Sequence, residues 1–179
     1  LWEVNRKLGF TRNIHFRDSI NLIKIWRDLF IRTGLLTLFM LVGTRVATRI
    51  SPEAGAAHQV IRQIWFFTAL VLGAFATTAQ SLVGYFYGSR RYEYARRVAL
   101  VTTGWSIATG FVLLILMLIG TQTVINALVP VEAIAVFGTA WLISALSQPL
   151  NSIAFITDGI HWGTSDYRYL RNGMICSTV

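Results

Sequence analysis

Four long stretches of mainly apolar residues constrain what this chain can fold into. They cover residues of about 29–48, 61–86, 98–120 and 133–162, with most charged residues between them. A helix that crosses a hydrocarbon core of about 30 Å needs about 20 mainly apolar residues, whereas a membrane strand alternates in polarity over about 10. Because lipid offers no partner for the backbone, such continuous runs must be helical. The sequence therefore predicts an all-α membrane protein, a polytopic bundle of transmembrane helices with four complete spans.

The composition excludes several other classes of protein. Apolar residues make up 54% of the chain and charged residues 13%, whereas a soluble domain carries roughly 25% charged residues. Disordered chains are poor in aromatic residues, which make up 13% here. A single cysteine allows neither a disulfide framework nor a multi-cysteine zinc site. The sequence also lacks HExxH, CxxC and phosphate-loop motifs, so we predict no enzyme, no metal site and no cofactor.

The basic residues lie on alternate sides of the predicted spans. The segment before the first span, the connection 87–97 and the tail after the fourth span are basic, whereas the opposite side holds only Arg45, Arg49 and Arg62. Lys and Arg are retained in the cytoplasm during insertion, so we expect the basic segments to be cytoplasmic. Anionic lipid then accounts for the net charge of +8 without a nucleic-acid partner. The basic side comprises Arg6, Lys7, Arg12, Arg17, Lys24, Arg27, Arg32, Arg90, Arg91, Arg96, Arg97, Arg168 and Arg171.

Residues 1–28 form a cytoplasmic or interfacial lead-in to the first span. Within it, Ile20–Phe30 has apolar residues at helical spacing, and Trp26 is suited to the headgroup level. An equally good interpretation makes this segment the first turns of the span itself. The chain begins without methionine and ends soon after a fresh apolar run starts at 173. We therefore expect a fragment of a longer protein, with a fifth span starting there.

Polar side chains interrupt the second and fourth stretches. Gln63 and Gln80 would lack a partner in lipid, so they should face protein or a water-filled cavity. For Gln80, packing between helices is the alternative. In the fourth stretch, Pro149 removes a backbone donor and predicts a kink, and Asn151 lies where freed carbonyls or a cation could be met.

Asp158 is an acid at the border of the fourth stretch. An intramembrane carboxylate is costly unless it is paired, protonated or bound to an ion, so it is a candidate functional residue. Ionised, it is a hard oxygen ligand for a small cation. The alternative is that Asp158 lies at the cytoplasmic end of the span, where it is solvated or paired with Arg168 or Arg171.

Several segments resemble the multidrug and toxic compound extrusion (MATE) family, in its DNA-damage-inducible F branch. Arg32–Val46 is similar to the seventh helix of that branch, Ala56–Leu70 and Ala79–Gly88 are similar to the eighth helix, and Gln148–Asn172 is similar to the tenth helix and its exit. The last segment carries a D-G-x-x-x-G pattern that consists of Asp158, Gly159 and Gly163.

The resemblance implies a secondary transporter of twelve helices in two six-helix lobes. Such proteins expel organic cations or lipophilic compounds against a Na⁺ or H⁺ gradient as the lobes rock. Residues 29–179 would then be part of the C-terminal lobe, from the seventh helix to the start of the eleventh. The implied partners are membrane lipid, a lipophilic or cationic small molecule and the remainder of the same chain. The implied location is the inner or plasma membrane of the cell.

The resemblance also assigns candidate site residues. Asp158 matches an acid that helps to bind the coupling cation in sodium-coupled relatives, and we add Asn151 as a second cation-binding residue. Two features depart from the family pattern, since Leu72 stands where the branch often has an acid and the seventh helix carries none. These departures support an alternative, a non-transporting structural or lipid-binding membrane subunit on a transporter-like scaffold. The candidate substrate-lining residues are Gln63, Trp65, Phe67 and Gln80, together with Asn151, because aromatic side chains suit flat cations.

Overall fold

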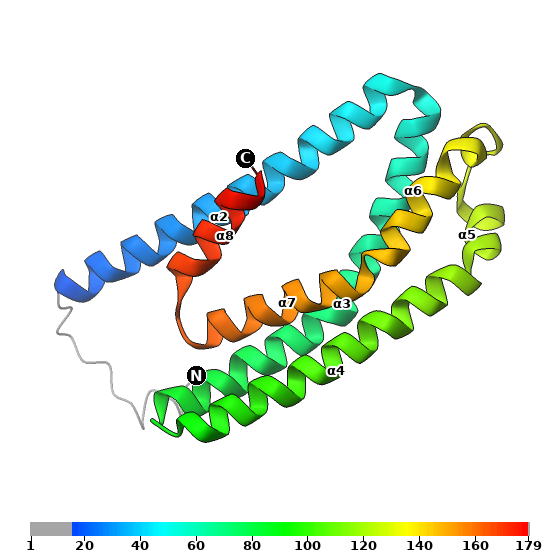
Figure 1. The fold of residues 1–179 in the computed structure, drawn as a ribbon. Helices are drawn as coiled ribbons and strands as arrows, with labels where there is room; N and C mark the ends of the chain where they lie inside the picture. Colours follow the sequence, from blue (N-terminus) through cyan, green and yellow to red (C-terminus); the bar gives the residue numbers. More distant parts are fainter. Residues whose placement is uncertain (1–15, 179) are drawn as a thin grey trace, which may run out of the picture.

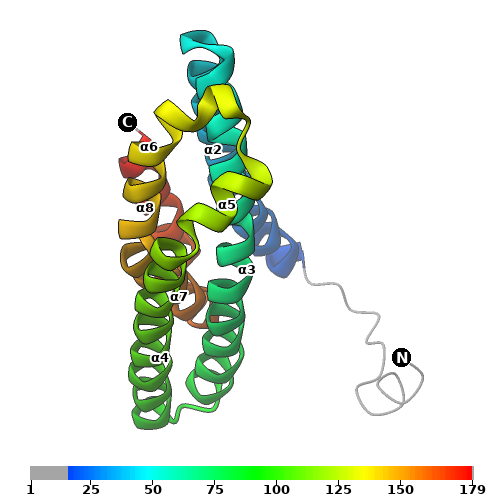
Figure 2. The same cartoon turned by 90° about the vertical axis from the view of Figure 1, so that its right-hand side faces the viewer.

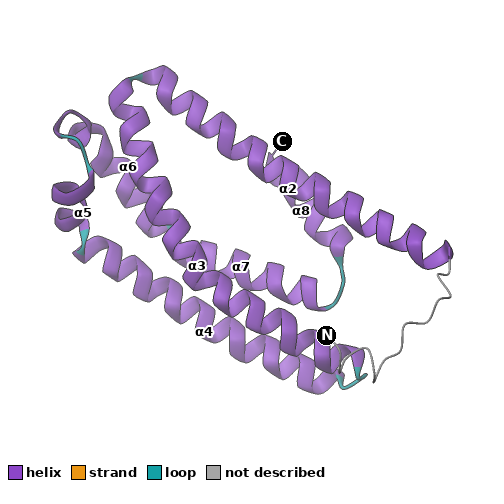
Figure 3. Cartoon of the chain, turned by 180° about the vertical axis from the view of Figure 1, so that it is seen from behind, coloured by secondary structure: helices purple, strands orange, loops and turns teal. Residues whose placement is uncertain are grey.

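The computed structural model describes residues 16–178, and every regular element in that range is a helix (Figure 1 and Figure 3). This confirms the predicted all-α fold class. The elements are α2 (Phe16–Ile50), α3 (Pro52–Gly88), α4 (Tyr92–Ile119), α5 (Thr121–Leu128), a 3-10 turn η1 (Val131–Ala133), α6 (Ile134–Leu146), α7 (Gln148–Gly163) and α8 (Tyr167–Thr178).

Three of the described helices are long and apolar enough to cross a membrane. They are Ile25–Ile50 within α2, and α3 and α4 over their whole lengths. The fourth predicted span is broken, because Val131–Leu146 and Gln148–Gly163 meet at an angle of 46°. If this bent pair is counted as one broken span, the described residues contain four spans. The prediction of a polytopic helical membrane protein is therefore confirmed for the described part of the chain.

Several helices extend beyond the predicted spans. Ile20–Phe30 is continuous with the rest of α2, and the part of α2 that is long and apolar enough to cross a membrane begins at Ile25. Residues 1–15 of the expected lead-in lie outside the described range. At the other end of the chain, α8 begins at Tyr167, ahead of residue 173 where a further helix was expected. The connection after α4 contains an additional short helix, α5, which Figure 2 shows crossing between α4 and α6.

A sharp turn at Ser51 joins α2 to α3. Ser51 has an extended backbone, and its Oγ accepts a hydrogen bond from the amide of Ala54 at 3.1 Å. Pro52 takes the first helical position, where its missing N–H removes no hydrogen bond, and Glu53 places negative charge near the positive end of the helix dipole. The sequence Ser-Pro-Glu therefore ends one span and starts the next.

A buried apolar cluster joins the start of α3 to the end of α4 and to α6. Phe137 and Trp141 of α6 stack with their ring centroids 5.3 Å apart. The indole N–H of Trp141 donates to the Met117 carbonyl at 3.3 Å and to the Thr121 hydroxyl at 3.0 Å, so it is satisfied although buried. Because both partners lie near the end of α4, this tryptophan fixes α6 against α4. The cluster comprises Ala57, Met117, Val129, Ala133, Phe137, Trp141 and Ala145.

Glycines let α7 pack directly against the backbone of α3. A Cβ placed on Gly159 would lie 2.3 Å from the carbonyl oxygen of Ala76, and one on Gly163 would lie 2.8 Å from that of Gln80. A Cβ on Gly84 of α3 would in turn lie 3.1 Å from the carbonyl oxygen of Gly163. Small residues four positions apart are typical of close helix pairs in membranes. These contacts fix both the position and the rotation of α7 on α3.

The turns that follow α3 and α7 are built alike. Arg90 and Ser165 have φ values of 57° and 61°, in the left-handed region where glycine is usual. In each turn, the amide of this residue and the next amide bond back to carbonyls three and five residues earlier, which is the Schellman arrangement. Both turns lie toward the same end of the molecule as the start of α2, on the left in Figure 1. The basic segments that the sequence groups on one side are therefore also grouped in space where they are described.

We predict that Gly159→Ala lowers the stability of the full-length protein by about 1–3 kcal/mol, the usual effect of overpacking. The new methyl group would overlap the Ala76 carbonyl oxygen, and that backbone atom cannot move aside without shifting α3. The readout is the thermal unfolding midpoint of protein purified in detergent. Gly138→Ala in α6, where a Cβ meets nothing within 4 Å, is the control. Equal midpoints for the two variants would contradict this packing of α7 on α3.

Candidate functional site

Asp158 of α7 forms an ion pair with Arg32 of α2. Nη2 of Arg32 donates to Oδ2 of Asp158, and the two side chains are 19% and 42% exposed, respectively. The rotation of α7 accounts for this meeting. Gly159 faces α3, and the residue before it points about 100° away around the helix axis. An acid and a base that would each be costly in lipid thus neutralise one another, and this pair is the centre of the candidate site.

A second ion pair, next to the first along α2, joins α2 to α8. Nη1 of Arg171 donates to Oδ1 of Asp28 at 2.8 Å, and Nη2 of Arg27 donates to the same oxygen at 3.0 Å. The side chain of Asp28 is only 6% exposed. Because Asp28 and Arg32 are four residues apart, they lie on the same face of α2. Together the two pairs fasten the first half of α2 to α7 and α8.

The ionic partner of Asp158 differs from those that the sequence predicts. The alternative that paired Asp158 with Arg168 or Arg171 is wrong about the arginine. Arg168 is exposed, and Arg171 is held by Asp28. Arg32 takes their place although it lies 126 residues earlier in the chain, because the end of α7 comes close to the first half of α2.

Pro149 and Asn151 lie near the break between α6 and α7. Pro149 is in the first turn of α7, directly after the 46° bend. Nδ2 of Asn151 donates to Oγ of Ser147 at 3.4 Å. Asn151 precedes Asp158 by two turns, a distance of about 10 Å along a helix that rises 1.5 Å per residue. The structure therefore does not bring Asn151 and Asp158 to one ion.

The candidate substrate-lining residues of α3 lie on different faces of that helix. Gln63 and Phe67 share an exposed face, with Phe67 65% exposed. Trp65, two residues from each, points to the other side and lies 6.4 Å from the Phe155 ring. Gln80 is half-buried, and its backbone carbonyl faces Gly163 of α7.

Trp65 lines a small pocket of about 140 Å³ between α2 and α3. Next to it, Nη1 of Arg62 donates to Oγ1 of Thr44 at 3.2 Å, and Nε2 of His58 lies 3.3 Å from the same hydroxyl. The Arg62 guanidinium also lies 5.5 Å from the centroid of the Phe66 ring. These contacts tie α2 to α3 near the Ser51 turn, away from Asp158. The pocket is lined by Met40, His58, Ile61, Arg62 and Trp65.

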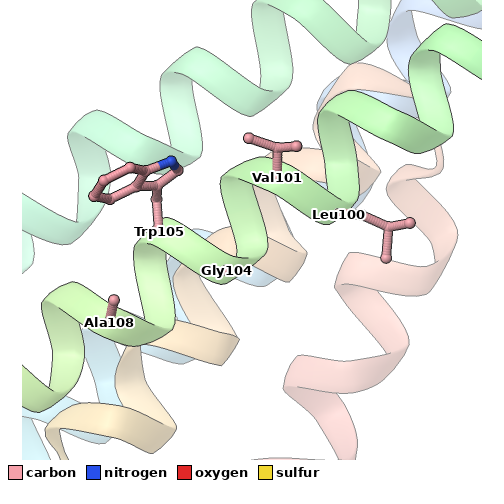
Figure 4. Close-up of a pocket in the computed structure, with 5 residues that line it drawn as sticks. All are labelled: Leu100, Val101, Gly104, Trp105 and Ala108. Atoms are coloured by element: carbon pink, nitrogen blue, oxygen red, sulfur yellow. The ribbon is translucent and has the colours of Figure 1, made fainter.

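A larger open groove of about 400 Å³ runs along one face of α4 (Figure 4). Its apolar lining comes from a single helix, and Trp105 within it is 67% exposed. A substrate site normally combines an apolar lining with a few convergent polar groups, which this groove does not have among its lining residues. It fits an acyl chain or another helix better than a polar substrate. The lining residues are Leu100, Val101, Gly104, Trp105 and Ala108.

Sequence reasoning missed a buried polar contact between α4 and α7. Oγ of Ser106 donates to the Ser152 carbonyl at 3.1 Å, and both residues are fully buried. Gly110 makes room for this contact, since a Cβ there would lie 2.7 Å from Oγ of Ser152. Gln148, one turn before Ser152, is also fully buried. The sequence pattern that could have indicated this contact is a pair of small or polar residues four positions apart on each helix. These pairs are Ser106 and Gly110 on α4, and Gln148 and Ser152 on α7.

We predict that Arg171→Gln loosens α8 from α2. Of the two ion pairs described for Asp28, the one with its neighbour Arg27 would remain, and removing one partner of a buried ion pair is strongly destabilising. Hydrogen exchange of the α8 amides in the full-length protein should accelerate by about tenfold or more. Arg168→Gln, which changes an exposed arginine of the same helix, is the matched control. Equal exchange in the two variants would show that the Asp28 pair does not hold α8.

Comparisons with known proteins agree with this architecture. The MatE family model matches residues 29–179. Protein DETOXIFICATION 44, chloroplastic, of Arabidopsis thaliana is 32% identical over 98% of this chain. Protein DETOXIFICATION 45, chloroplastic, of the same plant is 29% identical over 80%, and Protein DETOXIFICATION 42 is 24% identical over 84%. No solved structure matches the chain.

The chain spans 34%, 26% and 30% of the lengths of these three relatives, or between about a quarter and a third. The family model, in contrast, covers most of the chain, from the start of the first predicted span onward. Three of the described helices of the chain are long and apolar enough to cross a membrane, as in a polytopic membrane protein. The chain therefore belongs to the MatE family of multidrug and toxic compound extrusion proteins.

Proposed function

We propose that this chain is part of a secondary active efflux transporter, an antiporter that exchanges organic cations or lipophilic compounds for Na⁺ or H⁺. Membership of the MatE family and the similarity to DETOXIFICATION proteins support efflux. In this proposal the described helices are the seventh to tenth, and part of the eleventh, of a C-terminal lobe. Alternating access then comes from rocking of this lobe against an N-terminal one.

The observation that carries the proposal is the half-buried carboxylate of Asp158, held by a single arginine among apolar helices. A carboxylate in a membrane span is tolerated when it is paired, protonated or bound to an ion. When Asp158 changes from the paired state to the protonated or ion-bound state, it gives up its arginine partner, so ion binding is coupled to breaking of the ion pair. Asp158 is therefore proposed to bind the coupling ion. Asn151, two turns away, is proposed as a second polar position along the ion's path.

The substrate is proposed to bind along the exposed face of α3. Gln63 and Phe67 lie on that face, which in this proposal is turned toward the N-terminal lobe. An aromatic ring next to an amide suits a flat lipophilic cation. Trp65 and Gln80 lie off this face, so we propose that they support the site through packing against α7.

The branch, orientation and membrane are also proposals. The Asp158-Gly159-Gly163 pattern supports the DNA-damage-inducible F branch. By the positive-inside rule, we propose that the α3–α4 and α7–α8 turns lie on the cytoplasmic side, or on the equivalent side of an organellar membrane, from which the chain is inserted. Two of the relatives are named as chloroplastic, which favours an organellar membrane over the inner or plasma membrane expected from the sequence.

One observation favours the alternative of a non-transporting structural or lipid-binding subunit. Leu72 stands where the branch often has an acid, and its side chain is 1% exposed. The position is therefore filled by apolar packing and offers no room for an ion. Such a subunit would keep the scaffold and the Asp158 pair without ion-driven flux.

In the full-length protein reconstituted into lipid vesicles, Asp158→Asn is expected to abolish the dependence of drug efflux on a Na⁺ or H⁺ gradient. An amide stays neutral and cannot exchange a cation for Arg32. Glu93→Gln, which changes an exposed acid in the first turn of α4, is the control. Efflux that keeps its ion dependence without the carboxylate would remove Asp158 from the mechanism. Wild-type protein that shows no gradient-driven flux would favour the non-transporting alternative.

Labelling of single cysteines tests the proposed orientation. In a Cys176→Ala background, which removes the exposed native thiol, Ser89→Cys and Thr164→Cys should react with an impermeant maleimide from the same side of the membrane. Gln122→Cys in α5 should react only from the other side, because α5 lies at the opposite end of the helices. Labelling of Ser89→Cys and Thr164→Cys from opposite sides would refute the four-span arrangement.

A further inference from the structure

Arg32 occupies the carboxylate that the proposed function assigns to a coupling cation. Oδ2 of Asp158 is already hydrogen-bonded to the Arg32 guanidinium, and within residues 16–178 this is the ion pair that Asp158 makes. A small cation at the same carboxylate would meet the charge of the guanidinium at close range. Like charges repel strongly at such distances in a poorly solvated site. Arg32 and a mobile cation therefore exclude one another from Asp158.

Arg32 has a second acceptor within reach on its own helix. Asp28 lies four residues earlier, the spacing at which acids and bases pair along a helix. Both Arg27 and Arg171 bond to Oδ1 of Asp28, so Oδ2 takes part in neither contact. Arg32 can thus leave Asp158 without being left unpaired in lipid. The two acceptors, on different helices, give Arg32 two discrete positions.

We propose that Arg32 is a tethered cation that competes with the coupling ion for Asp158 and thereby sets the affinity of this site for that ion. The inference rests on the proposed function. When Na⁺ or H⁺ binds the carboxylate, the Arg32–Asp158 hydrogen bond breaks and the guanidinium moves one turn along α2 to Oδ2 of Asp28. At Asp158 one positive charge thus replaces another, so the net charge next to this carboxylate stays the same. Arg32 is a positioning residue, since it acts through Asp158.

The exchange also changes how α2 is held. The Asp158 pair connects α2 to α7, whereas the Asp28–Arg171 pair connects α2 to α8. Transfer of Arg32 to Asp28 therefore releases α2 from α7 and leaves it attached to α8. Among the described side chains, the charged or titratable groups that act on Asp158 are Arg32 of α2 and His161, which lies about one turn further along α7. The next such groups are Asp28, four residues from Arg32 and paired with Arg171 of α8, and Tyr169 of α8, whose ring stacks on that of His161. From α3, Ala76 and Gln80 face this part of α7, and neither titrates.

The test measures the thermal unfolding midpoint of the full-length protein in detergent against NaCl, with choline chloride to hold ionic strength, and separately against pH. In Arg32→Gln the competing charge is lost. The sodium concentration that gives half of the midpoint shift should then fall about tenfold, or the pH that gives half of the shift should rise by about one unit. This size is expected because one neighbouring charge changes proton affinity by that order. The two arms distinguish Na⁺ from H⁺. Arg32→Ala is a second neutral variant, and Arg32→Lys should resemble the wild type.

Two controls locate the effect at Asp158. Adding Asp158→Asn to Arg32→Gln should abolish the gain, and Arg45→Gln, which changes an exposed arginine of the same helix, should produce none. A wild-type response in both neutral variants, or a gain that survives Asp158→Asn, would overturn the proposal. Because the readout is ion binding, it is independent of transport. A gain in affinity without any wild-type flux in vesicles would overturn the proposed function alone.

Discussion

The contact between α7 and the backbone of α3 is the constraint on which the rest of the site depends. Gly159 lies against the Ala76 carbonyl so closely that no side chain fits between them. That contact fixes the rotation of α7, and the carboxylate of the preceding residue must then point toward α2 rather than into α3. In a membrane, where apolar burial does not drive helices together, close packing of this kind is what positions a polar side chain.

The helical fold could be predicted because its causes are local. A run of apolar residues long enough to cross a bilayer leaves the backbone no choice but a helix. The boundary at Ser51 could be predicted in the same way, since a cap, a proline and an acid stand next to one another. The break between α6 and α7 lies where Pro149 removes a donor. The additional helix α5 could not be predicted as a separate element, because its residues continue the apolar stretch of α4.

The partner of Asp158 could not be predicted, because nearness in sequence favours the wrong arginines. Arg168 and Arg171 follow Asp158 closely, but Asp28 holds Arg171 and Arg168 is exposed. Arg32 is easily counted as one more basic residue at the start of a span. The informative fact is that an arginine inside an apolar stretch needs an acid, and Asp158 borders another stretch. Similarly, Gln63, Trp65 and Phe67 are close in sequence, yet helical rotation puts Trp65 on a different face.

Polar contacts hold α2 to the rest of the structure in both of its halves. The most hydrophobic window of its span contains no buried residue, in contrast to those of α3 and α4. Near the Ser51 turn, Thr44 meets His58 and Arg62, and at the other end two ion pairs join α2 to α7 and α8. Apolar contacts given up in lipid are replaced by contacts with acyl chains at little cost, whereas a charged side chain needs a new partner. The ion pairs therefore constrain where the first half of α2 can lie relative to α7 and α8.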